Sequence, residues 1–288
     1  MKKFGLIGYP IKGSLSPALF RAGYGGKYPY DLIENADFEA AYRKFLDEYD
    51  GVNITAPYKE DAFRKADIID PVCQRIGATN LTVKTPEGIH AYNSDYIGIR
   101  RSLIETALGC IPEDETDINA GITDFFGHRP DALVVGCGGA GKAAAVAAAG
   151  LGMKTCLMNR TAARAEKIAL ELPEYGFYVK PLDDFMQMFM KCDVIIYTLP
   201  ESIQEIQALE SGELPPQKDA GKKIILEANY KTPAFSHEAM SRLQKTCPGI
   251  RYVSGLRWLL HQAAGGYELF TGEVPDFRAM EKAITPGL

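Results

Sequence analysis

The sequence has no excess of basic charge and no long hydrophobic run. Its 288 residues include 32 Lys and Arg against 37 Asp and Glu, which gives a formal net charge of −5. The broad basic patch that nucleic acids require is therefore not expected. No segment approaches the roughly 18 apolar residues of a membrane span, and Gly8 and Pro10 interrupt the apolar start before it reaches the length of a signal peptide. These absences predict a cytoplasmic protein without nucleic-acid or membrane partners.

Cysteine and histidine are few and dispersed. The six cysteines lie far apart, without a Cys-x-x-Cys pair, and the four histidines show no spacing typical of metal ligands. We therefore expect reduced thiols rather than a disulfide framework, and no metal site. A Gly-x-Ser-x-Gly elbow is also missing, which removes the commonest sequence signal of a serine hydrolase.

The length of the chain and the order of its apolar segments predict two α/β domains. A chain of 288 residues is long enough for two domains that each have their own core. Short apolar segments at 4–8 and 51–55 predict strands, and the apolar periodicity from Phe38 predicts a helix capped by Asp37. From residue 132 onward strands alternate with helices, the pattern of a doubly wound parallel sheet. The acidic stretch 109–131 has little periodicity and is predicted to be an exposed, irregular connection.

A glycine-rich turn opens the first strand-helix unit of the second domain. Gly136, Gly138 and Gly141 have the G-x-G-x-x-G spacing of a dinucleotide-binding turn. The first glycine makes the tight turn, the second lets the backbone approach a pyrophosphate, and the third lets helix and strand pack closely. The helix N-terminus then offers N–H groups to the phosphates. We therefore predict cofactor contacts from Gly136, Gly138, Gly139, Ala140 and Gly141.

The segment after the next predicted strand distinguishes NADP from NAD. NAD sites commonly place an acidic residue about twenty positions past the glycine turn, where it binds the ribose 2′-hydroxyl. This chain has instead Asn159, Arg160 and Thr161 there, with Arg164 one helical turn later. A guanidinium pairs with a 2′-phosphate that a carboxylate would repel. These four residues predict NADP as the cofactor.

Four polar segments outside the glycine-turn domain carry residue types that active sites use. They are 8–17, 52–59, 77–80 and 92–95, which contain Ser14, Ser16, Thr55, Lys59, Asn80, Asn93 and Asp95. Taken singly, each segment is an ordinary turn or cap, because Ser, Asn, Pro and Gly are turn residues. Their order along the chain is more informative than any one of them.

Together the segments resemble the shikimate dehydrogenase family. The matching motifs are Ser-x-Ser-Pro at 14–17, Asn-x-Thr-x-Pro-x-Lys at 53–59, Gly-Ala-x-Asn at 77–80, Asn-x-Asp at 93–95 and a C-terminal signature at 255–263. The resemblance covers nearly the whole chain except 109–131 and 201–219. It implies NADP-linked interconversion of 3-dehydroshikimate and shikimate, on the route to aromatic amino acids.

The resemblance also implies roles for individual residues. Lys59 and Asp95 match the family's catalytic pair. The implied substrate contacts are Ser14, Ser16 and Tyr230 for the carboxylate, and Thr55, Asn80, Asn93 and Gln262 for the hydroxyls or for support of the catalytic pair. These roles agree with the chemistry, because reduction of a ketone needs a proton on the emerging alkoxide and an ammonium can polarise and then protonate that oxygen.

Several positions depart from the family's pattern, and most of them are on the cofactor side. They are Gly13 for a usual histidine, Lys142 for an arginine, Tyr197 in place of Asn-x-Thr, Glu227 for an aspartate and Trp258 for a methionine. The catalytic pair is unchanged. We expect the Trp258 ring to lie against the nicotinamide or to cap its pocket.

The predicted substrate-binding domain comprises residues 1–103 plus 237–288, and the predicted NADP-binding Rossmann domain comprises 104–236. The C-terminal helices are expected to return to the first domain. The protein is expected to be a monomer or homodimer. One alternative is a quinate/shikimate dehydrogenase with relaxed NAD/NADP use. Another is a non-catalytic sensor that binds the cofactor or shikimate. A third is a folate-interconverting dehydrogenase, which the Ser14 and Ser16 loop argues against.

Overall fold

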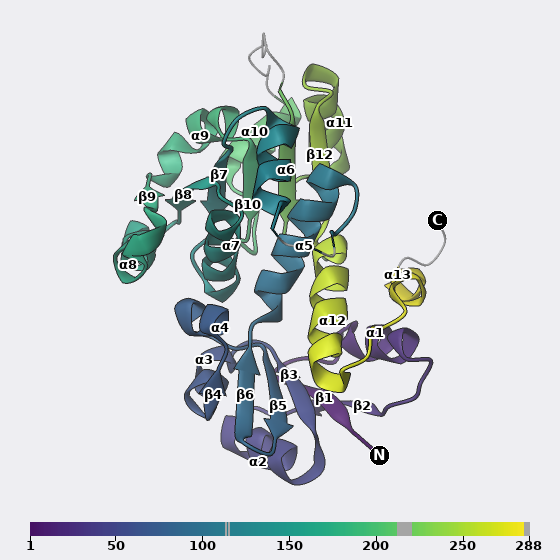
Figure 1. The fold of residues 1–288 in the computed structure, drawn as a ribbon. Coiled ribbons are helices and arrows are strands. Elements are labelled where there is room, and N and C mark those ends of the chain that lie inside the picture. The colour runs from purple at the N-terminus through teal and green to yellow at the C-terminus, as the bar shows by residue number, and fades with distance from the viewer. Residues whose placement is uncertain (113, 115, 212–220, 285–288) are drawn as a thin grey trace. The chain divides into compact units, whose positions relative to one another are not determined.

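The computed structural model describes residues 1–112, 114, 116–211 and 221–284. The chain divides into two compact units (Figure 1). The first comprises Met1–Gly98 and the segment that begins at Leu259, and the second comprises Ile99–Trp258. Each unit contains a six-stranded sheet within the described residues. The prediction of two α/β domains is confirmed.

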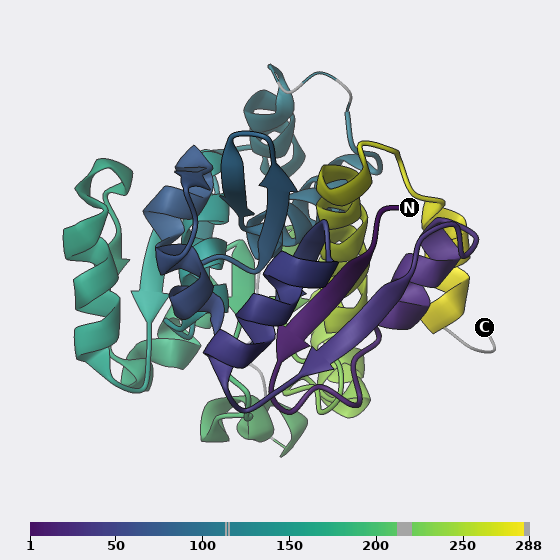
Figure 2. The same ribbon diagram turned by 90° about the horizontal axis from the view of Figure 1, so that it is seen from below.

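The sheet of the first unit is mixed. Its strand order is β2 (Tyr30–Glu34), β1 (Phe4–Gly8), β3 (Gly51–Ile54), β5 (Leu81–Thr85), β6 (Gly88–Tyr92) and β4 (Ile68–Ile69). β1 pairs in parallel with both β2 and β3, whereas β5 runs antiparallel to β3 and β6. Figure 2 shows β1 and β2 side by side. The carboxyl ends of β1 and β3 therefore lie at the same edge, where the segments after Gly8 and Ile54 begin.

Helices flank this sheet. They are α1 (Ser16–Gly23), α2 (Phe38–Glu48), α3 (Lys59–Arg64), α4 (Pro71–Ile76) and α13 (Phe277–Ile284), together with the part of α12 (Gly255–Thr271) from Leu259 onward. α2 begins at the predicted cap, because Asp37 Oδ1 accepts hydrogen bonds from the N–H groups of Glu39 and Ala40. α1 lies against α13 (Figure 2).

The apolar pattern of residues 61–69 predicts one helix, but only its first part is helical. α3 ends at Arg64, and Ile68–Ile69 form the short strand β4. β4 pairs with His90 and Ala91 of β6, and the Asp67 carboxylate accepts a hydrogen bond from the N–H of Ile89. Tertiary pairing with the hairpin therefore overrides the local helical pattern.

The sheet of the second unit is entirely parallel. Its order is β12 (Ile250–Val253), β11 (Lys223–Glu227), β10 (Val194–Tyr197), β7 (Asp131–Val135), β8 (Lys154–Met158) and β9 (Tyr178–Val179). The chain starts at β7, builds outward to β9, and then continues from β10 on the other side of β7. The strand order therefore reverses between β7 and β10, and ligands of such sheets bind outside the carboxyl ends of the strands at this point.

Helices and 3₁₀ turns connect these strands. They are α5 (Ser94–Leu108, in this unit from Ile99), α6 (Ile118–Phe126), α7 (Gly139–Gly150), α8 (Ala162–Glu171), η1 (Pro173–Tyr175), η2 (Leu182–Asp184), α9 (Phe185–Lys191), α10 (Gln204–Ser211) and α11 (His237–Thr246). Met186, Met188 and Met190 on α9 belong to or pack against the core cluster that contains Leu133, Ile195 and Ile225. These methionines therefore take part in core packing.

The stretch 109–131 contains a helix where an irregular connection was predicted. α6 runs from Ile118 to Phe126 and buries Ile118 and Ile122, which lie on one face of the helix. The Phe125 ring contacts the Lys222 ammonium and the Arg251 guanidinium at 4.4 and 4.8 Å from its centroid. This packing stabilises a helix whose sequence signal is weak. Glu113 and Glu115 of the acidic run lie outside the described residues.

The expected return of the chain to the first unit at residue 237 is too early. α11 and β12 both belong to the second unit, and β12 extends its sheet by pairing with β11, Lys223 opposite Ile250. The return occurs within α12, after Trp258. Among the described residues no helix is long and apolar enough to cross a membrane.

Candidate active site

The two residues predicted as a catalytic pair form an ion pair in the first unit. Lys59 is the first residue of α3, and its ammonium lies 2.5 Å from Asp95 Oδ2. Asp95 is in the first turn of α5, where free N–H groups and the helix dipole favour a carboxylate. The Asp95 side chain is only 6% exposed and that of Lys59 24%, so Lys59 is the more accessible member of the pair.

The segment 77–80 connects the two members of this pair. The N–H of Thr79 donates to the Lys59 carbonyl at 3.1 Å. The N–H of Ser94, next to Asp95, donates to Asn80 Oδ1 at 2.6 Å. Asn80 is 2% exposed, and its Nδ2 has no hydrogen-bond partner among the described residues. A buried amide donor without a partner is rare in proteins, and it is suited to bind a ligand oxygen.

Asn93 lies between this segment and α5. Its Nδ2 donates to the Ala78 carbonyl at 2.8 Å, and its Oδ1 accepts from the N–H of Tyr96 at 3.2 Å. Both ends of this amide therefore have protein partners. The geometry suits Asn93 to support of the Asp95 helix start more than to direct contact with a ligand.

The serine loop lies in the same unit. Ser14 Oγ donates to Ser16 Oγ at 3.1 Å and accepts from the N–H of Ser16 at 3.2 Å. Both serines, Thr55 after β3 and Gln262 on α12 are half-buried. Of the predicted substrate contacts, Tyr230 alone belongs to the second unit.

Two tyrosines that no motif singled out touch this part of the first unit. The Tyr267 hydroxyl donates to the Ser16 carbonyl at 3.0 Å, and the Tyr30 hydroxyl donates to Asn53 Oδ1 at 2.8 Å. The sequence offers no local signal for either contact, because Tyr267 and Ser16 are separated by 251 positions.

The glycine turn between β7 and α7 has the geometry that each glycine predicts. Gly136 has a φ of +104°, and a Cβ there would overlap Thr198 Oγ1. A Cβ on Gly141 would overlap the carbonyl oxygen of Gly136. In contrast, a Cβ on Gly138 or Gly139 would meet no atom within 4 Å. The open side of the turn and the unpaired N–H groups in the first turn of α7, which includes Ala140, therefore fit a pyrophosphate.

The residues after β8 lie next to this turn. Asn159 is buried, and its Oδ1 accepts from the N–H of Cys137 at 3.0 Å while its Nδ2 donates to the Thr161 carbonyl at 3.0 Å. Arg160, Thr161 and Arg164 are exposed. Asn159 therefore joins the glycine turn to the segment that carries the two arginines.

Lys142, which follows the glycines, has its own partner on the neighbouring helix. Its ammonium lies 2.7 Å from Glu171 Oε2 at the end of α8. This ion pair is a sufficient explanation for a lysine at this position, and Lys142 was not among the predicted cofactor contacts.

Glu227 and Tyr197, two departures from the family's pattern, are register partners at the ends of β11 and β10. Glu227 is fully buried and accepts hydrogen bonds from the N–H groups of Ala234 and Phe235 and from the Tyr252 hydroxyl. Burial raises the pKa of its carboxyl despite these donors. The Tyr197 hydroxyl donates to the Glu201 carbonyl at 2.6 Å. Glu227 thus links the end of β11 to the end of the segment 228–235, which contains Tyr230.

Trp258 and His261, both on α12, are buried. Trp258 is 5% exposed and is the last residue of the second unit. His261 is 1% exposed, and its ring lies 5.0 Å from that of Phe277. This packing is the structural role expected for that histidine.

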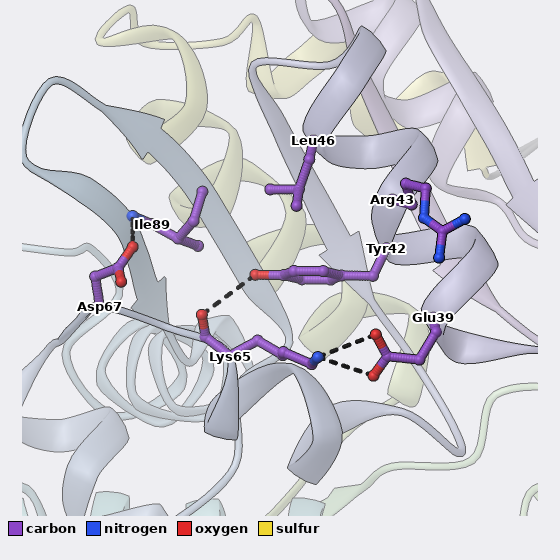
Figure 3. A pocket seen from close by; sticks show the side chains of 7 residues that line it. All are labelled: Glu39, Tyr42, Arg43, Leu46, Lys65, Asp67 and Ile89. Carbon is purple, nitrogen blue, oxygen red and sulfur yellow. Dashed lines mark hydrogen bonds and ion pairs between the residues drawn. The ribbon is translucent and has the colours of Figure 1, made fainter.

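A surface pocket of ≈ 410 Å³ lies elsewhere in the first unit and contains none of the predicted site residues. It is lined by Glu39, Tyr42, Arg43, Leu46, Lys65, Asp67 and Ile89 (Figure 3). Lys65 pairs with Glu39 at 2.9 Å and accepts a hydrogen bond from the Tyr42 hydroxyl at its carbonyl. The pocket is lined by two acidic and two basic side chains, so it favours neither an anionic nor a cationic ligand.

Three family models match segments of this chain. Residues 6–82 match the shikimate dehydrogenase substrate binding domain, 124–223 match the shikimate / quinate 5-dehydrogenase model, and 255–285 match the shikimate 5′-dehydrogenase C-terminal domain. The chain is 30% identical over 302 residues to the shikimate dehydrogenase (NADP(+)) of Archaeoglobus fulgidus, an alignment that covers 100% of this chain and 99% of that protein.

Solved structures show the same relationship. The shikimate dehydrogenase of Mycobacterium tuberculosis is similar with a TM-score of 0.76 and 27% identity, over 98% of each chain. The shikimate 5-dehydrogenase of Thermus thermophilus, solved in complex with NADP(H) and shikimate, has a TM-score of 0.73 and 27% identity, also over 98% of each chain. With its fold, its motifs and its relatives in agreement, this chain belongs to the shikimate dehydrogenase family.

Proposed function

We propose that the protein is an NADP-dependent shikimate dehydrogenase, which reversibly reduces 3-dehydroshikimate to shikimate in the biosynthesis of aromatic amino acids. The observation that carries the proposal is the ion pair between Lys59 and Asp95, in the unit that also contains the serine loop and the Asn80 Nδ2 without a partner among the described residues. The relative from Archaeoglobus fulgidus carries this name, and the similar structure from Thermus thermophilus holds both NADP(H) and shikimate.

Lys59 is the proton donor in this mechanism. NADPH supplies a hydride to the ketone carbon when it is bound. The Lys59 ammonium hydrogen-bonds to the ketone oxygen, stabilises its growing negative charge and transfers a proton to it. Asp95 holds the ammonium in place and is itself held by the first turn of α5. In the reverse direction Lys59 accepts the proton from the substrate hydroxyl.

The remaining polar groups of the first unit suit a cyclic hydroxy acid. The Ser14 and Ser16 hydroxyls are assigned to the carboxylate, together with Tyr230 from the second unit. Asn80 Nδ2 is assigned to a ring hydroxyl because this buried donor has no partner among the described residues. Thr55 and Gln262 complete the hydroxyl contacts, and Asn93 supports Asp95.

The second unit is assigned to NADP. Gly136, Gly138, Gly139, Ala140 and Gly141 form the pyrophosphate turn, where the open space at Gly138 and Gly139 supports the assignment. Asn159 and Thr161 shape the adjoining segment, and the exposed Arg160 and Arg164 bind the 2′-phosphate. The Trp258 indole is assigned to the nicotinamide side. If the indole contacts the nicotinamide, NADP should quench the fluorescence of this single tryptophan.

One assay tests the function directly. Purified protein is mixed with shikimate and NADP, and NADPH formation is followed by its absorbance, beside reactions with NAD and with quinate. We expect the highest kcat/KM for shikimate with NADP. Absence of turnover with shikimate, while NADP and shikimate both bind, would favour the non-catalytic sensor instead.

Quinate is the second candidate substrate, because the matching family model covers shikimate and quinate dehydrogenases together. Arg160 and Arg164 favour NADP over NAD at the ribose. They do not distinguish quinate from shikimate as the substrate. A higher kcat/KM for quinate than for shikimate would change the substrate in our assignment and leave Lys59 and Asp95 in their roles.

We further propose a cytoplasmic enzyme that acts as a monomer or homodimer. The dispersed, unpaired cysteines support a reducing compartment. Light scattering of the purified protein measures its mass in solution, and fractionation of the source cells tests the location.

A further inference from the structure

Three tyrosines of the first unit share one aromatic cluster but send their hydroxyls to different places. The Phe20 ring lies 5.1 Å from Tyr24, 4.7 Å from Tyr30 and 4.7 Å from Tyr267, measured between ring centroids. Tyr24 donates to Glu273 and contacts Thr271 Oγ1, at the C-terminal end of α12. Tyr30 and Tyr267 instead reach two polar segments of the candidate site.

The Tyr267 hydroxyl holds the serine loop. It donates to the Ser16 carbonyl at 3.0 Å, and the tyrosine is 1% exposed. Ser16 in turn is hydrogen-bonded to Ser14 through both its N–H and its hydroxyl. One buried phenol on α12 therefore fixes the backbone from which both serine hydroxyls project.

The Tyr30 hydroxyl holds the amide that begins the second motif. It donates to Asn53 Oδ1 at 2.8 Å, and Asn53 Nδ2 points toward the Asn80 carbonyl at 3.4 Å. Asn80 carries the buried Nδ2 that has no partner among the described residues. Tyr30 therefore acts on the hydroxyl-binding side of the site, whereas Tyr267 acts on the carboxylate side.

The two phenols remain hydrogen-bond donors throughout the physiological pH range. Burial raises the pKa of Tyr30 and of Tyr267 well above the ordinary value for tyrosine. A neutral donor that does not titrate can set the geometry of a site without adding a charge that would repel an anionic substrate.

We propose that Tyr267 and Tyr30 are positioning residues for the substrate, a cyclic hydroxy acid: Tyr267 orients the serines that bind its carboxylate, and Tyr30, through Asn53, orients Asn80, which binds a ring hydroxyl. The inference rests on the proposed function. It adds to that function a division of the site into two halves, each supported from the same aromatic cluster.

The test removes single hydroxyls with Tyr267→Phe and Tyr30→Phe, and uses Tyr24→Phe as the matched control from the same cluster. Loss of one neutral hydrogen bond is expected to raise the KM for shikimate about three- to tenfold in the first two variants. The kcat and the KM for NADP should stay within about twofold, since neither hydroxyl touches Lys59 or the glycine turn. Tyr24→Phe should match the wild type in all three constants.

Shikimate methyl ester separates the two halves of the site. Because the ester lacks the carboxylate, Tyr267→Phe should have the same KM as the wild type for the ester, whereas Tyr30→Phe should keep its higher KM. An unchanged KM for shikimate in both variants would overturn the inference. So would equal losses with acid and ester in Tyr267→Phe, or a fall in kcat and NADP affinity alongside a lower melting temperature, which would indicate general unfolding.

The failure of the inference is distinguishable from failure of the proposed function. If the wild-type protein does not oxidise shikimate with NADP, the proposed function is wrong before any variant is compared. If the wild type is active and the tyrosine variants behave as Tyr24→Phe does, only the inference is wrong.

Discussion

The ammonium of Lys59 and the carboxylate of Asp95 lie 2.5 Å apart although the residues are 36 positions apart in the chain. Each occupies the start of a helix, α3 for Lys59 and α5 for Asp95. The Asp95 side chain is almost fully buried, while about a quarter of the Lys59 side chain is exposed. In this arrangement a buried carboxylate holds the ammonium that we propose as the proton donor.

Lys59→Ala should lower kcat by about 10²–10⁴-fold, because it removes the proton donor for the substrate oxygen. Steady-state oxidation of shikimate measures the effect. Lys65→Ala is the matched control, since Lys65 follows the other end of α3 and pairs with the exposed Glu39. Wild-type turnover in Lys59→Ala would remove Lys59 from the mechanism.

Gly138→Ala should weaken NADP binding without unfolding the protein. A Cβ there meets no protein atom within 4 Å, so the added methyl group occupies only the space assigned to the pyrophosphate. Gly141→Ala should instead destabilise the second unit, because its Cβ overlaps the Gly136 carbonyl. NADP titration and thermal melting distinguish the two variants. Tight NADP binding by a well-folded Gly138→Ala would place the cofactor elsewhere.

Replacement of both Arg160 and Arg164 by alanine should raise the KM for NADP and leave that for NAD nearly unchanged. The guanidinium groups are assigned to the 2′-phosphate, which NAD lacks. Loss of two charge-assisted contacts should lower the ratio of kcat/KM for NADP to kcat/KM for NAD by at least about tenfold. Lys167→Ala, an exposed change on the same helix, serves as the control. An unchanged ratio in the double variant would contradict the assignment.

Glu227 should make the stability of the protein depend on pH. Burial raises the pKa of its carboxyl above the ordinary value of 4.5, so the folded state favours the protonated form. Its contribution to the free energy of unfolding is therefore complete below about pH 4.5 and is lost as the pH rises through the folded-state pKa. Glu227→Gln removes this titration.

Urea unfolding of wild type and Glu227→Gln between about pH 4.5 and 8 tests that sign. The free energy of unfolding of the wild type minus that of the variant should decrease as the pH rises. Glu238→Gln, on the exposed face of α11, should show no such trend. A difference that grows with pH would mean that the three hydrogen-bond donors outweigh the cost of burial.

Much of the architecture followed from local patterns. The strand at Phe4–Gly8, the cap at Asp37 and the hairpin of β5 and β6 were predictable because apolar spacing, capping and turn chemistry act over a few residues. The G-x-G-x-x-G turn was predictable for the same reason. Gly136 and Gly141 are required by close contacts with Thr198 and within the turn itself.

Elements whose stability comes from distant partners could not be predicted in this way. β4 is two residues long and exists through its pairing with β6, and β12 exists through its pairing with β11. The helix α6 gains its order from Phe125 between Lys222 and Arg251. For the same reason the second domain boundary lies after Trp258 and not at residue 237, where it was predicted.

For the site, the sequence by itself determined the prediction: the resemblance of its motifs to the family assigns the chemistry to Lys59, Asp95, the serines and the glycine turn. Only the tertiary structure decided how they are held. The contact of Tyr267 with Ser16 spans 251 positions, and the three hydrogen bonds of Glu227 close a loop around a fully buried carboxylate. Such contacts leave no periodicity in the chain, because they arise from side chains that meet only after the sheets have formed.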